Sequence, residues 1–360
     1  MSTIHSKRIV IFAPYPKGTA PSQRFRFEQY LELFEKEGYV IEYKAFLSDS
    51  AWNILYKDGS YIKKTFHILA SFFRRWKEVF TTKRYDIIFI HREMAHIGPP
   101  IFEWILAKIL KRKFIYDLDD AIWMANYSES NAKFQRLKAY WKVNYCMKWA
   151  SKISAGNEFL ANYSRQFNPN VTVIPTTIDL MNQHNLITDY DKTPIIIGWT
   201  GTLTTMNYLE EIIPVLQKLE DNYSFIFRVI SNQEPKFDLK SLQYIPWNKS
   251  TEIADLAQIQ IGLMPLADDK WAQGKCGFKA LQYMALGIPT LLSPVGVNKQ
   301  IVKHQETGFF CSTTEEWMVF LEKLLQDSSL RKTIGQAGRA VIQNHYSVTA
   351  NFNKYLNLLQ

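Results

Sequence analysis

Short runs of apolar residues alternate with amphipathic segments along the whole chain, and this alternation limits the folds that the chain can adopt. The apolar runs include 7–15 and 85–93 in the first half, and 195–201, 225–231 and 288–293 in the second. Continuously apolar strands are typical of parallel sheets covered by helices on both faces. Because the pattern restarts after a polar stretch, we predict an α/β protein with two Rossmann-like, doubly wound domains and a ligand cleft between them.

The length supports this division, since 360 residues exceed one ordinary hydrophobic core. We place an N-terminal domain at 1–180, a linker at 181–194 and a C-terminal domain at 195–340. A last helix, at 341–360, could pack back on the N-terminal domain.

The composition is typical of a folded protein, with 47% hydrophobic and 21% charged residues. Three widely spaced cysteines, Cys146, Cys276 and Cys311, match neither a disulfide framework nor a zinc motif. We expect no signal peptide and no membrane-spanning run of about 18 apolar residues. The expected location is therefore the cytoplasm.

The net charge of +9 is concentrated in one region. Residues 61–113 contain twelve Lys or Arg and four Asp or Glu, an excess of eight positive charges. Within this region, 61–84 has the pattern of a basic amphipathic helix rich in Phe, which fits an anionic membrane surface at the inner face of the membrane. The alternative is a core helix with a solvated, charged end. No recognition motif accompanies the charge, so nucleic acid is not an expected partner.

The segment 274–296, GKCGFKALQYMALGIPTLLSPVG, carries the clearest candidate chemistry, and it reads as a glycine-rich turn, a helix and a buried strand. Lys275 and Lys279 lie near the predicted helix start, where the helix dipole disfavours each cation by about 0.3–1 kcal/mol. A bound phosphate would reverse this penalty, because the free N–H groups of the helix start and both lysines would then face an anion. The alternative is that both lysines are solvated.

The segment 262–310, together with IYDLDDAIW (115–123), SAGNEFLANYS (154–164) and GWTGT (198–202), resembles the GT-B-fold retaining glycosyltransferases of family 4, the group 1 glycosyltransferases. The resemblance covers nearly the whole chain and is most specific in the C-terminal part. It implies a GT-B fold whose C-terminal domain binds a nucleotide-sugar and whose N-terminal domain binds the acceptor.

The resemblance also implies roles for individual residues. Many members have two glutamates eight positions apart that correspond here to Gly274 and Gln282, so both carboxylates are absent. A variant of the family has a lysine three residues before the second position, and Lys279 fits that variant. The Arg and Lys that usually follow the first strand of the C-terminal domain are missing too. The implied donor-binding residues are Gly201, Thr202, Lys275, Gly277, Lys279, Gln282, Gly296, Val297 and Asn298.

Polar residues of the first half follow predicted strands and are candidates for the acceptor side. Gly18, Arg24 and Arg26 come after the first strand, and His91 ends a later one. Glycine permits close backbone approach, and arginine suits bidentate phosphate contacts. Exposed arginines and a structural histidine are the alternatives.

The run DLDD at 117–120 could suggest a magnesium or manganese site. We instead expect no metal and no cofactor, because lysines in the other half would neutralise the diphosphate. The predicted catalytic residues are then Asp119, Asp120 and Lys279. The two aspartates are expected to bind the acceptor hydroxyl. Structural aspartates at a strand end are the alternative.

The expected function is transfer of a sugar from a nucleotide-sugar to a glycan or lipid-linked acceptor, with retention, in cell-surface polysaccharide or glycolipid synthesis. One alternative is a nucleotide-sugar epimerase of the same fold, which would need acid/base carboxylates that the sequence does not display. The other is a non-catalytic subunit that binds sugar nucleotides.

Overall fold

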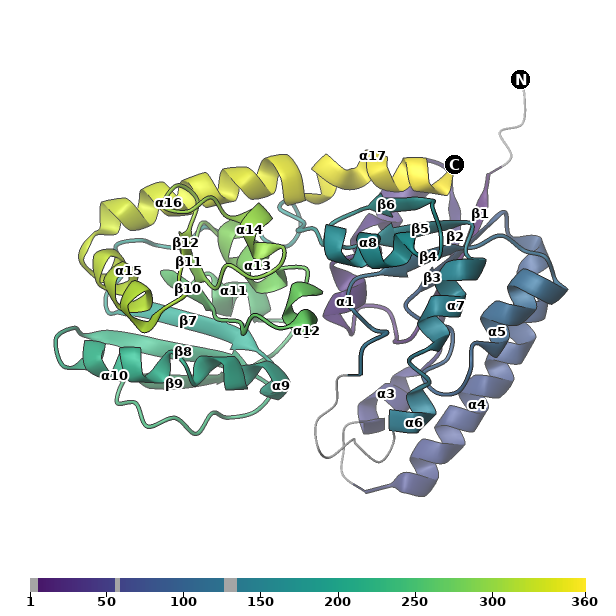
Figure 1. The fold of residues 1–360 in the computed structure, drawn as a ribbon, viewed down its shortest axis with the longest axis horizontal. Helices are drawn as coiled ribbons and strands as arrows, with labels where there is room; N and C mark the ends of the chain where they lie inside the picture. Colours follow the sequence, from purple (N-terminus) through teal and green to yellow (C-terminus); the bar gives the residue numbers. More distant parts are fainter. Residues whose placement is uncertain (1–5, 56–58, 126–134) are drawn as a thin grey trace. The chain divides into compact units, whose positions relative to one another are not determined.

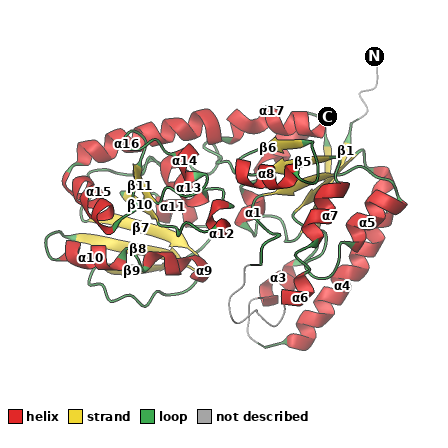
Figure 2. Ribbon diagram, in the orientation of Figure 1, coloured by secondary structure: helices red, strands yellow, loops and turns green. Residues whose placement is uncertain are grey.

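The computed structural model describes residues 6–55, 59–125 and 135–360, which fall into two compact units. Unit 1 comprises Met1–Thr176 and Phe352–Gln360, and unit 2 comprises Thr177–Asn351. Each unit contains a six-stranded, fully parallel sheet packed against helices, as Figures 1 and 2 show. The predicted pair of doubly wound α/β domains is therefore confirmed.

The sheet of unit 1 has the strand order β2-β1-β3-β4-β5-β6. Its strands are β1 (Arg8–Ala13), β2 (Val40–Ala45), β3 (Ile87–His91), β4 (Ile115–Leu118), β5 (Lys152–Ala155) and β6 (Val171–Val173). Its helices are α1 (Pro21–Arg24), α2 (Leu31–Lys36), α3 (Asp49–Leu55), α4 (Tyr61–Phe80), α5 (Ile101–Trp104), α6 (Gln135–Lys138), α7 (Lys142–Trp149) and α8 (Glu158–Arg165), with 3-10 turns at Glu28–Tyr30 and Thr82–Arg84 and a π-helical turn at Ile105–Ile109.

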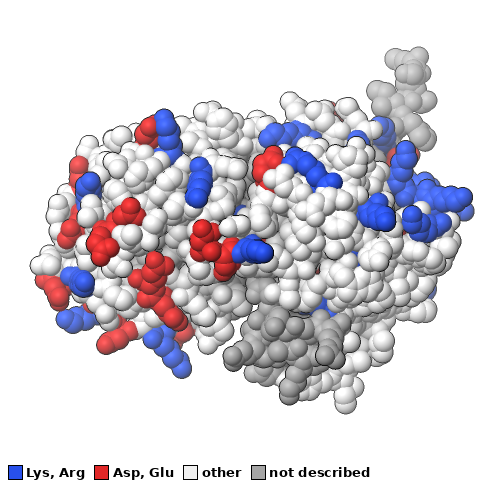
Figure 3. Space-filling view, viewed as in Figure 1, with Lys and Arg blue, Asp and Glu red and all other residues white. Residues whose placement is uncertain are grey.

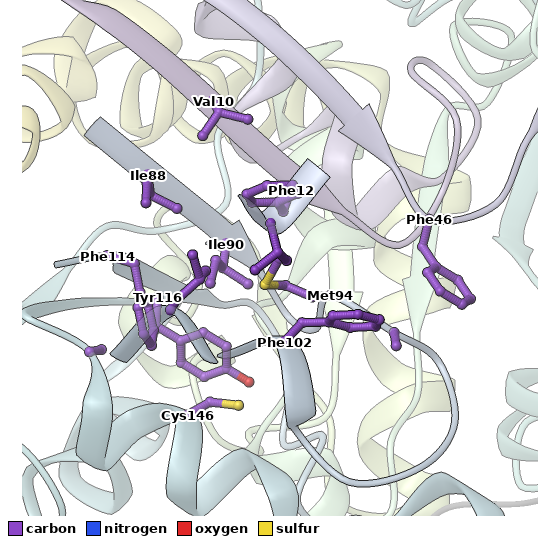
Figure 4. Packing of buried hydrophobic residues seen from close by; sticks show 14 of the residues in the cluster. Val10, Phe12, Phe46, Ile88, Ile90, Met94, Phe102, Phe114, Tyr116 and Cys146 are labelled. Carbon is purple, nitrogen blue, oxygen red and sulfur yellow. The ribbon is translucent and has the colours of Figure 1, made fainter. Parts of the chain in front are cut away.

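Side chains from neighbouring strands form the core of unit 1 on the side of the sheet that α5 and α7 cover (Figure 4). Phe12, Ile90 and Tyr116 come from β1, β3 and β4, and they pack in one cluster with Phe102 of α5 and Cys146 of α7. Ile11, Phe89 and Ile115, which point to the opposite face, are buried as well, so both faces of the sheet are covered and the strands are continuously apolar.

The end of the chain contributes an aromatic contact to unit 1. Helix α17 (Val348–Leu359) places the Phe352 ring 5.7 Å from Phe34 and the Tyr355 ring 4.5 Å from Tyr30. Tyr30 and Tyr355 are almost fully buried. The last residues therefore pack on the helical segment that follows β1.

The sheet of unit 2 has the order β12-β11-β10-β7-β8-β9. Its strands are β7 (Ile195–Gly201), β8 (Phe225–Ser231), β9 (Leu242–Pro246), β10 (Ile261–Met264), β11 (Thr290–Leu292) and β12 (Phe309–Phe310). Its helices are α9 (Leu203–Met206), α10 (Ile213–Glu220), α11 (Glu252–Leu256), α12 (Lys270–Gln273), α13 (Phe278–Ala285), α14 (Asn298–Ile301), α15 (Thr314–Gln326) and α16 (Ser328–Val341), with a 3-10 turn at Asn207–Leu209 and a π-helical turn at Ile342–Tyr346.

Three local expectations differ from the structure. The amphipathic spacing of Phe27, Tyr30, Leu31 and Phe34 predicts a single helix after β1, but the structure divides this segment into α1, a 3-10 turn and α2. The sequence VTVIPTTID at 171–179 predicts a strand, which in the structure ends at Val173. Strand β9 has no counterpart among the predicted strands, because it is a half-buried strand at the edge of the sheet whose sequence, LQYIP, is neither continuously apolar nor regularly alternating. None of these differences changes the topology.

Candidate functional site

The carboxyl ends of β7 and β10 mark the point in unit 2 where the strand order reverses. Strand β7 pairs with β8 on one side and with β10 on the other, and the chain crosses from one half of the sheet to the other between them. Ligands of doubly wound sheets bind at this place. The residues that follow Gly201 and Met264 are therefore candidates for ligand binding.

Helix α13 is fixed over these two strands by one tyrosine. The Tyr283 hydroxyl accepts a hydrogen bond of 2.9 Å from the Thr200 N–H in β7. Its ring lies so close to β10 that a Cβ on Gly262 would be 2.6 Å from it. Gly262 is thus the residue that lets α13 approach the sheet, and the start of α13 is held near the switch point.

Two lysines flank the start of α13. The Lys279 Nζ lies 5.2 Å from the centre of the buried Trp199 ring, and the Lys275 Nζ lies 5.5 Å from that of Trp271. Burial, and then the neighbouring Lys275 charge, lower the pKa of Lys279 to about 7. A cation that is disfavoured for these two reasons is poised to gain an anionic partner.

Two glycines in the left-handed region shape the loops beside these lysines. Gly277 has φ +68°, and a Cβ there would be 2.2 Å from Ile301 and 3.2 Å from Val297. Gly296 has φ +53°, and its Cβ would be 2.9 Å from the backbone of Gln273. The predicted residues Gly277, Gly296 and Val297 are therefore brought together.

Asn298 has a structural contact within the same loop. Its side chain is buried and its Nδ2 donates a hydrogen bond of 2.9 Å to the Ser293 carbonyl. The amide thus holds the turn between β11 and α14.

Gly201 and Thr202 lie at the end of β7, next to Trp199. A Cβ on Gly201 would be 2.4 Å from the Trp199 ring, and the Thr202 N–H donates to the Thr205 hydroxyl over 3.2 Å at the start of α9. The Trp199 ring therefore contacts Gly201 and also lies beneath Lys279. Through this ring the structure brings the end of β7 and the start of α13 together.

Gln282 lies deep in unit 2, with only 1% of its surface exposed. Its Nε2 is 3.4 Å from an oxygen of Glu252 and 3.5 Å from the Nε2 of His184. Sequence reasoning noted that the family's carboxylate is missing at position 282, but it did not find Glu252. No local signal could have found it, because the two residues are thirty positions apart.

In unit 1, a buried ion-pair network lies at the carboxyl ends of β3 and β4. The Arg26 guanidinium pairs with an Asp117 oxygen at 2.5 Å and donates to the Ser154 hydroxyl at 3.0 Å. The other Asp117 oxygen lies 2.7 Å from the His91 Nδ1. Burial raises the pKa of Asp117, but Arg26 and His91 outweigh it and hold the pKa well below its usual range. The predicted acceptor-side residue Arg26 is therefore engaged within the protein.

His91 extends the network toward the predicted catalytic aspartates. Its Nε2 is buried, has no hydrogen-bond partner among the described residues, and lies 3.8 Å from Asp119. Both Asp119 oxygens bind the Arg92 guanidinium, at 2.5 Å and 2.7 Å. Asp120 accepts a hydrogen bond of 2.9 Å from the Ala121 N–H. Arg92, which sequence reasoning missed, has a φ of +59°, a backbone conformation that is costly for a non-glycine residue.

The loop after β1 has its own polar contacts. Gly18 has φ +78°, and its N–H donates to a Glu28 oxygen over 2.8 Å. Burial raises the pKa of Glu28. Arg24 is 8% exposed, with its guanidinium 5.0 Å from the centre of the Phe25 ring. The four acceptor-side residues all lie in unit 1, where Arg26 and His91 share a network through Asp117.

Among residues 6–55, 59–125 and 135–360, no group of three or more His, Cys, Asp or Glu side chains is placed to hold a metal ion. In the same part of the chain, none of the helices is both long enough and apolar enough to cross a membrane.

Comparisons with known proteins define the class of this fold. A glycosyltransferase from Rickettsia africae is 15% identical, with a TM-score of 0.68, and the match covers 99% of this chain and 98% of that one. A sucrose-phosphate synthase from Thermosynechococcus elongatus is 13% identical, with a TM-score of 0.68 and 98% of each chain covered. HepE from Anabaena, solved in complex with UDP-glucose, is 14% identical, with a TM-score of 0.62, and the match covers 98% of this chain and 99% of that one. The fold is that of the GT-B glycosyltransferases, as predicted.

The sequence comparison is more specific for unit 2. Residues 186–341 match the family described as glycosyl transferases, group 1. This match confirms the prediction of a glycosyltransferase enzyme with a group 1 domain. No match is found among curated protein sequences.

Proposed function

We propose that the protein transfers a sugar from a nucleotide-sugar to an acceptor hydroxyl with retention of the anomeric configuration, as a family 4 enzyme. The proposal extends to cell-surface polysaccharide or glycolipid synthesis in the cytoplasm, with a glycan or lipid-linked acceptor. HepE, a structural neighbour, was solved with UDP-glucose, so uridine diphosphate sugars are the first donors to test.

The observation that carries the proposal is the lysine pair at the start of α13. Lys279 is held over Trp199 beside Lys275, and its pKa is lowered by burial and by the neighbouring Lys275 charge, both of which a bound anion would offset. A departing nucleoside diphosphate would supply that anion. Cations that are already in place when negative charge develops on the diphosphate lower the activation barrier, because the site does not have to rearrange around that charge.

The remaining residues are assigned by their place in each unit. In unit 2, the backbone around Gly201, Thr202, Gly277 and Gly296 would contact the diphosphate and sugar, since small residues leave the N–H groups accessible. Val297, Asn298 and Gln282 would shape the pocket around them, as buried residues.

In unit 1, His91 and Asp119 are proposed to face the acceptor hydroxyl, with Arg92 fixing the carboxylate. Asp120, Gly18 and Arg24 complete the acceptor side, whereas Arg26 would act by positioning His91 through Asp117.

We propose that transfer needs no metal ion, because the lysines would neutralise the diphosphate themselves. The DLDD aspartates support this, since Asp119 is occupied by Arg92 and Asp117 by Arg26 and His91. Initial rates of transfer should be unchanged by EDTA, and activity that returns only on addition of Mg²⁺ or Mn²⁺ would contradict this part of the proposal.

The test is a thermal-shift screen of nucleotide-sugars followed by turnover assays. A donor at about 100 times its Kd should stabilise the protein by about 2.7 kcal/mol. A transferase releases nucleotide only when an acceptor is present, and NMR of the product reports its anomeric configuration. An epimerase would change the sugar without an acceptor. A non-catalytic binding subunit would bind a donor tightly and turn over no acceptor of a broad panel.

A further inference from the structure

Helix α4 of unit 1 carries a row of apolar side chains on its outward face. Six of them, each between 40% and 88% exposed, recur at spacings of four and three residues and so form one stripe along the helix. The opposite face packs into the core, where Ser71, Arg75 and Val79 are buried. The stripe consists of Ile62, Phe66, Leu69, Phe73, Trp76 and Phe80.

The stripe continues onto α5 and the π-helical turn that follows it. The Trp76 ring lies 5.3 Å from that of Phe102 at the base of α5, so the two helices are neighbours (Figure 1). Ile101, Trp104 and Ile109 are 40%, 44% and 57% exposed on this second segment. Together, the stripe and these three residues form what we name the α4–α5 apolar surface.

Within the described segments Tyr61–Phe80 and Ile101–Ile109, the exposed charged side chains are all positive. The described segments Tyr61–Phe80 and Ile101–Ile109 contain two acidic residues, Glu78 and Glu103, and both are buried. Lys63, Lys77 and Lys108 are exposed on the same segments, and the Lys77 Nζ lies 4.8 Å from the centre of the Phe73 ring. Figure 3 shows Lys and Arg side chains gathered over the part of unit 1 where these helices end.

We propose that the α4–α5 apolar surface docks on the anionic surface of a lipid bilayer, with Phe and Trp side chains inserted among the headgroups and lysines against the phosphates. Aromatic side chains and flanking cations are the combination that interfacial helices use. A second copy of the chain is the competing occupant, because spacings of four and three also suit a coiled coil. The positive charge of the flanking lysines favours the bilayer, because a dimer formed through this surface would bring the lysines of the two copies close together. This inference concerns unit 1 and does not depend on the proposed transfer reaction.

The experiment is flotation of the full chain with vesicles of phosphatidylglycerol and phosphatidylcholine in equal parts, and with vesicles of phosphatidylcholine alone. The wild type should float with the anionic vesicles, and less so at high salt. Phe66→Ser/Phe73→Ser should lower its partition coefficient about a hundredfold. Lys63→Gln/Lys77→Gln should lower it about tenfold or more.

The matched controls are Met181→Ser/Val319→Ser and Lys299→Gln/Lys332→Gln, which change exposed residues of unit 2 and should float like the wild type. Thermal unfolding, with and without UDP-glucose, should be the same for every variant as for the wild type. This check separates loss of docking from loss of folding or of donor binding.

Two results overturn the proposal. The first is a wild type that does not float, or a Phe66→Ser/Phe73→Ser variant that floats as well as the wild type. The second is a wild type that does not float and sediments as a dimer, while the Phe66→Ser/Phe73→Ser variant sediments as a monomer. This result would assign the surface to a second copy of the chain.

Discussion

The Lys279 ammonium lies 5.2 Å from the centre of the Trp199 ring, although Trp199 is in β7 and Lys279 is in α13. The buried ring limits hydration of the ammonium, while the electron-rich face of the ring offers it only partial compensation. Together with the neighbouring Lys275 charge, this explains why the pKa of Lys279 falls to about 7.

The shift predicts that donor affinity depends on pH. A bound diphosphate favours the charged lysine and raises its pKa, so binding should take up a proton where free Lys279 is neutral. Affinity should therefore fall as pH rises from about 7 to 9, by up to about tenfold per pH unit. Isothermal titration calorimetry in two buffers of different ionisation enthalpy measures the proton uptake directly. Lys279→Met should abolish the uptake, whereas uptake that persists in this variant would assign it to another group.

The same shift fixes the sign of a stability effect in the absence of donor. Unfolding returns Lys279 toward its ordinary pKa of 10.5, so between about pH 7 and 10.5 the unfolded state binds more protons. The cost of the buried charge is fully present below about pH 7 and is relieved as pH rises. Urea unfolding should therefore show the largest gain of Lys279→Met over wild type below about pH 7, and a gain that grows with pH would contradict the assignment.

Gly262→Ala should displace α13. The new Cβ would lie 2.6 Å from the Tyr283 ring, so we expect a loss of about 1–3 kcal/mol in the free energy of unfolding and a weaker response to donor. The double variant with Tyr283→Leu should lose less than the sum of the two single changes, because the clash is removed. Simple additivity in chemical denaturation would show that the two residues do not interact.

Arg26→Met should leave a buried carboxylate without its cation. We expect a loss of about 3–5 kcal/mol in unfolding free energy at neutral pH. Because the folded pKa of Asp117 is depressed, its stabilising contribution is present above the ordinary carboxylate range and lost as pH falls, so the deficit should shrink in acid. The control is Arg165→Met, which removes an exposed ion pair with Glu158 and should cost below about 1 kcal/mol. Equal losses for the two variants would rule out the buried network as a stabilising element.

Gln282→Glu tests why this chain departs from the family pattern. The new carboxylate would lie beside the buried Glu252, and two like charges cannot both ionise there without cost. We expect a loss of about 1–3 kcal/mol at pH 7 that diminishes toward pH 5, where one of the pair retains a proton. Gln282→Leu, which adds no charge, provides the pH-independent control. A Gln282→Glu protein as stable as wild type at pH 7 would mean that Glu252 does not lie close enough to position 282 to oppose a second carboxylate.

Local sequence signals were enough to predict most of the fold. Apolar runs such as 195–201, which forms β7, identify buried parallel strands. Gly277 and Gly287, both in the left-handed region, mark the two ends of α13. The basic amphipathic helix predicted within 61–84 is confirmed as α4, which ends at Phe80. Strand β9 was missed because an edge strand needs no continuous apolar run.

The contacts that give the site residues their chemistry were not predictable in the same way. Arg26 and Asp117 are 91 residues apart, and their pairing depends on how the turn after α1 packs against the end of β4 in the folded unit. A list of candidate residues could name both without showing that one neutralises the other. Trp199 was read only as part of a strand, and its contact with Lys279 depends on how α13 packs on β7.

The central claim, that the start of α13 binds the diphosphate of a nucleotide-sugar, is tested most directly by calorimetric titration of the wild type, Lys279→Met and Lys299→Met with the best donor from the thermal-shift screen. Lys299 is an exposed lysine of the same unit, on α14. We predict that Lys279→Met weakens binding at least about tenfold, since a charge-assisted contact contributes about 1.5–3 kcal/mol, and that Lys299→Met binds like the wild type. Equal affinity of all three proteins for the donor would contradict the account.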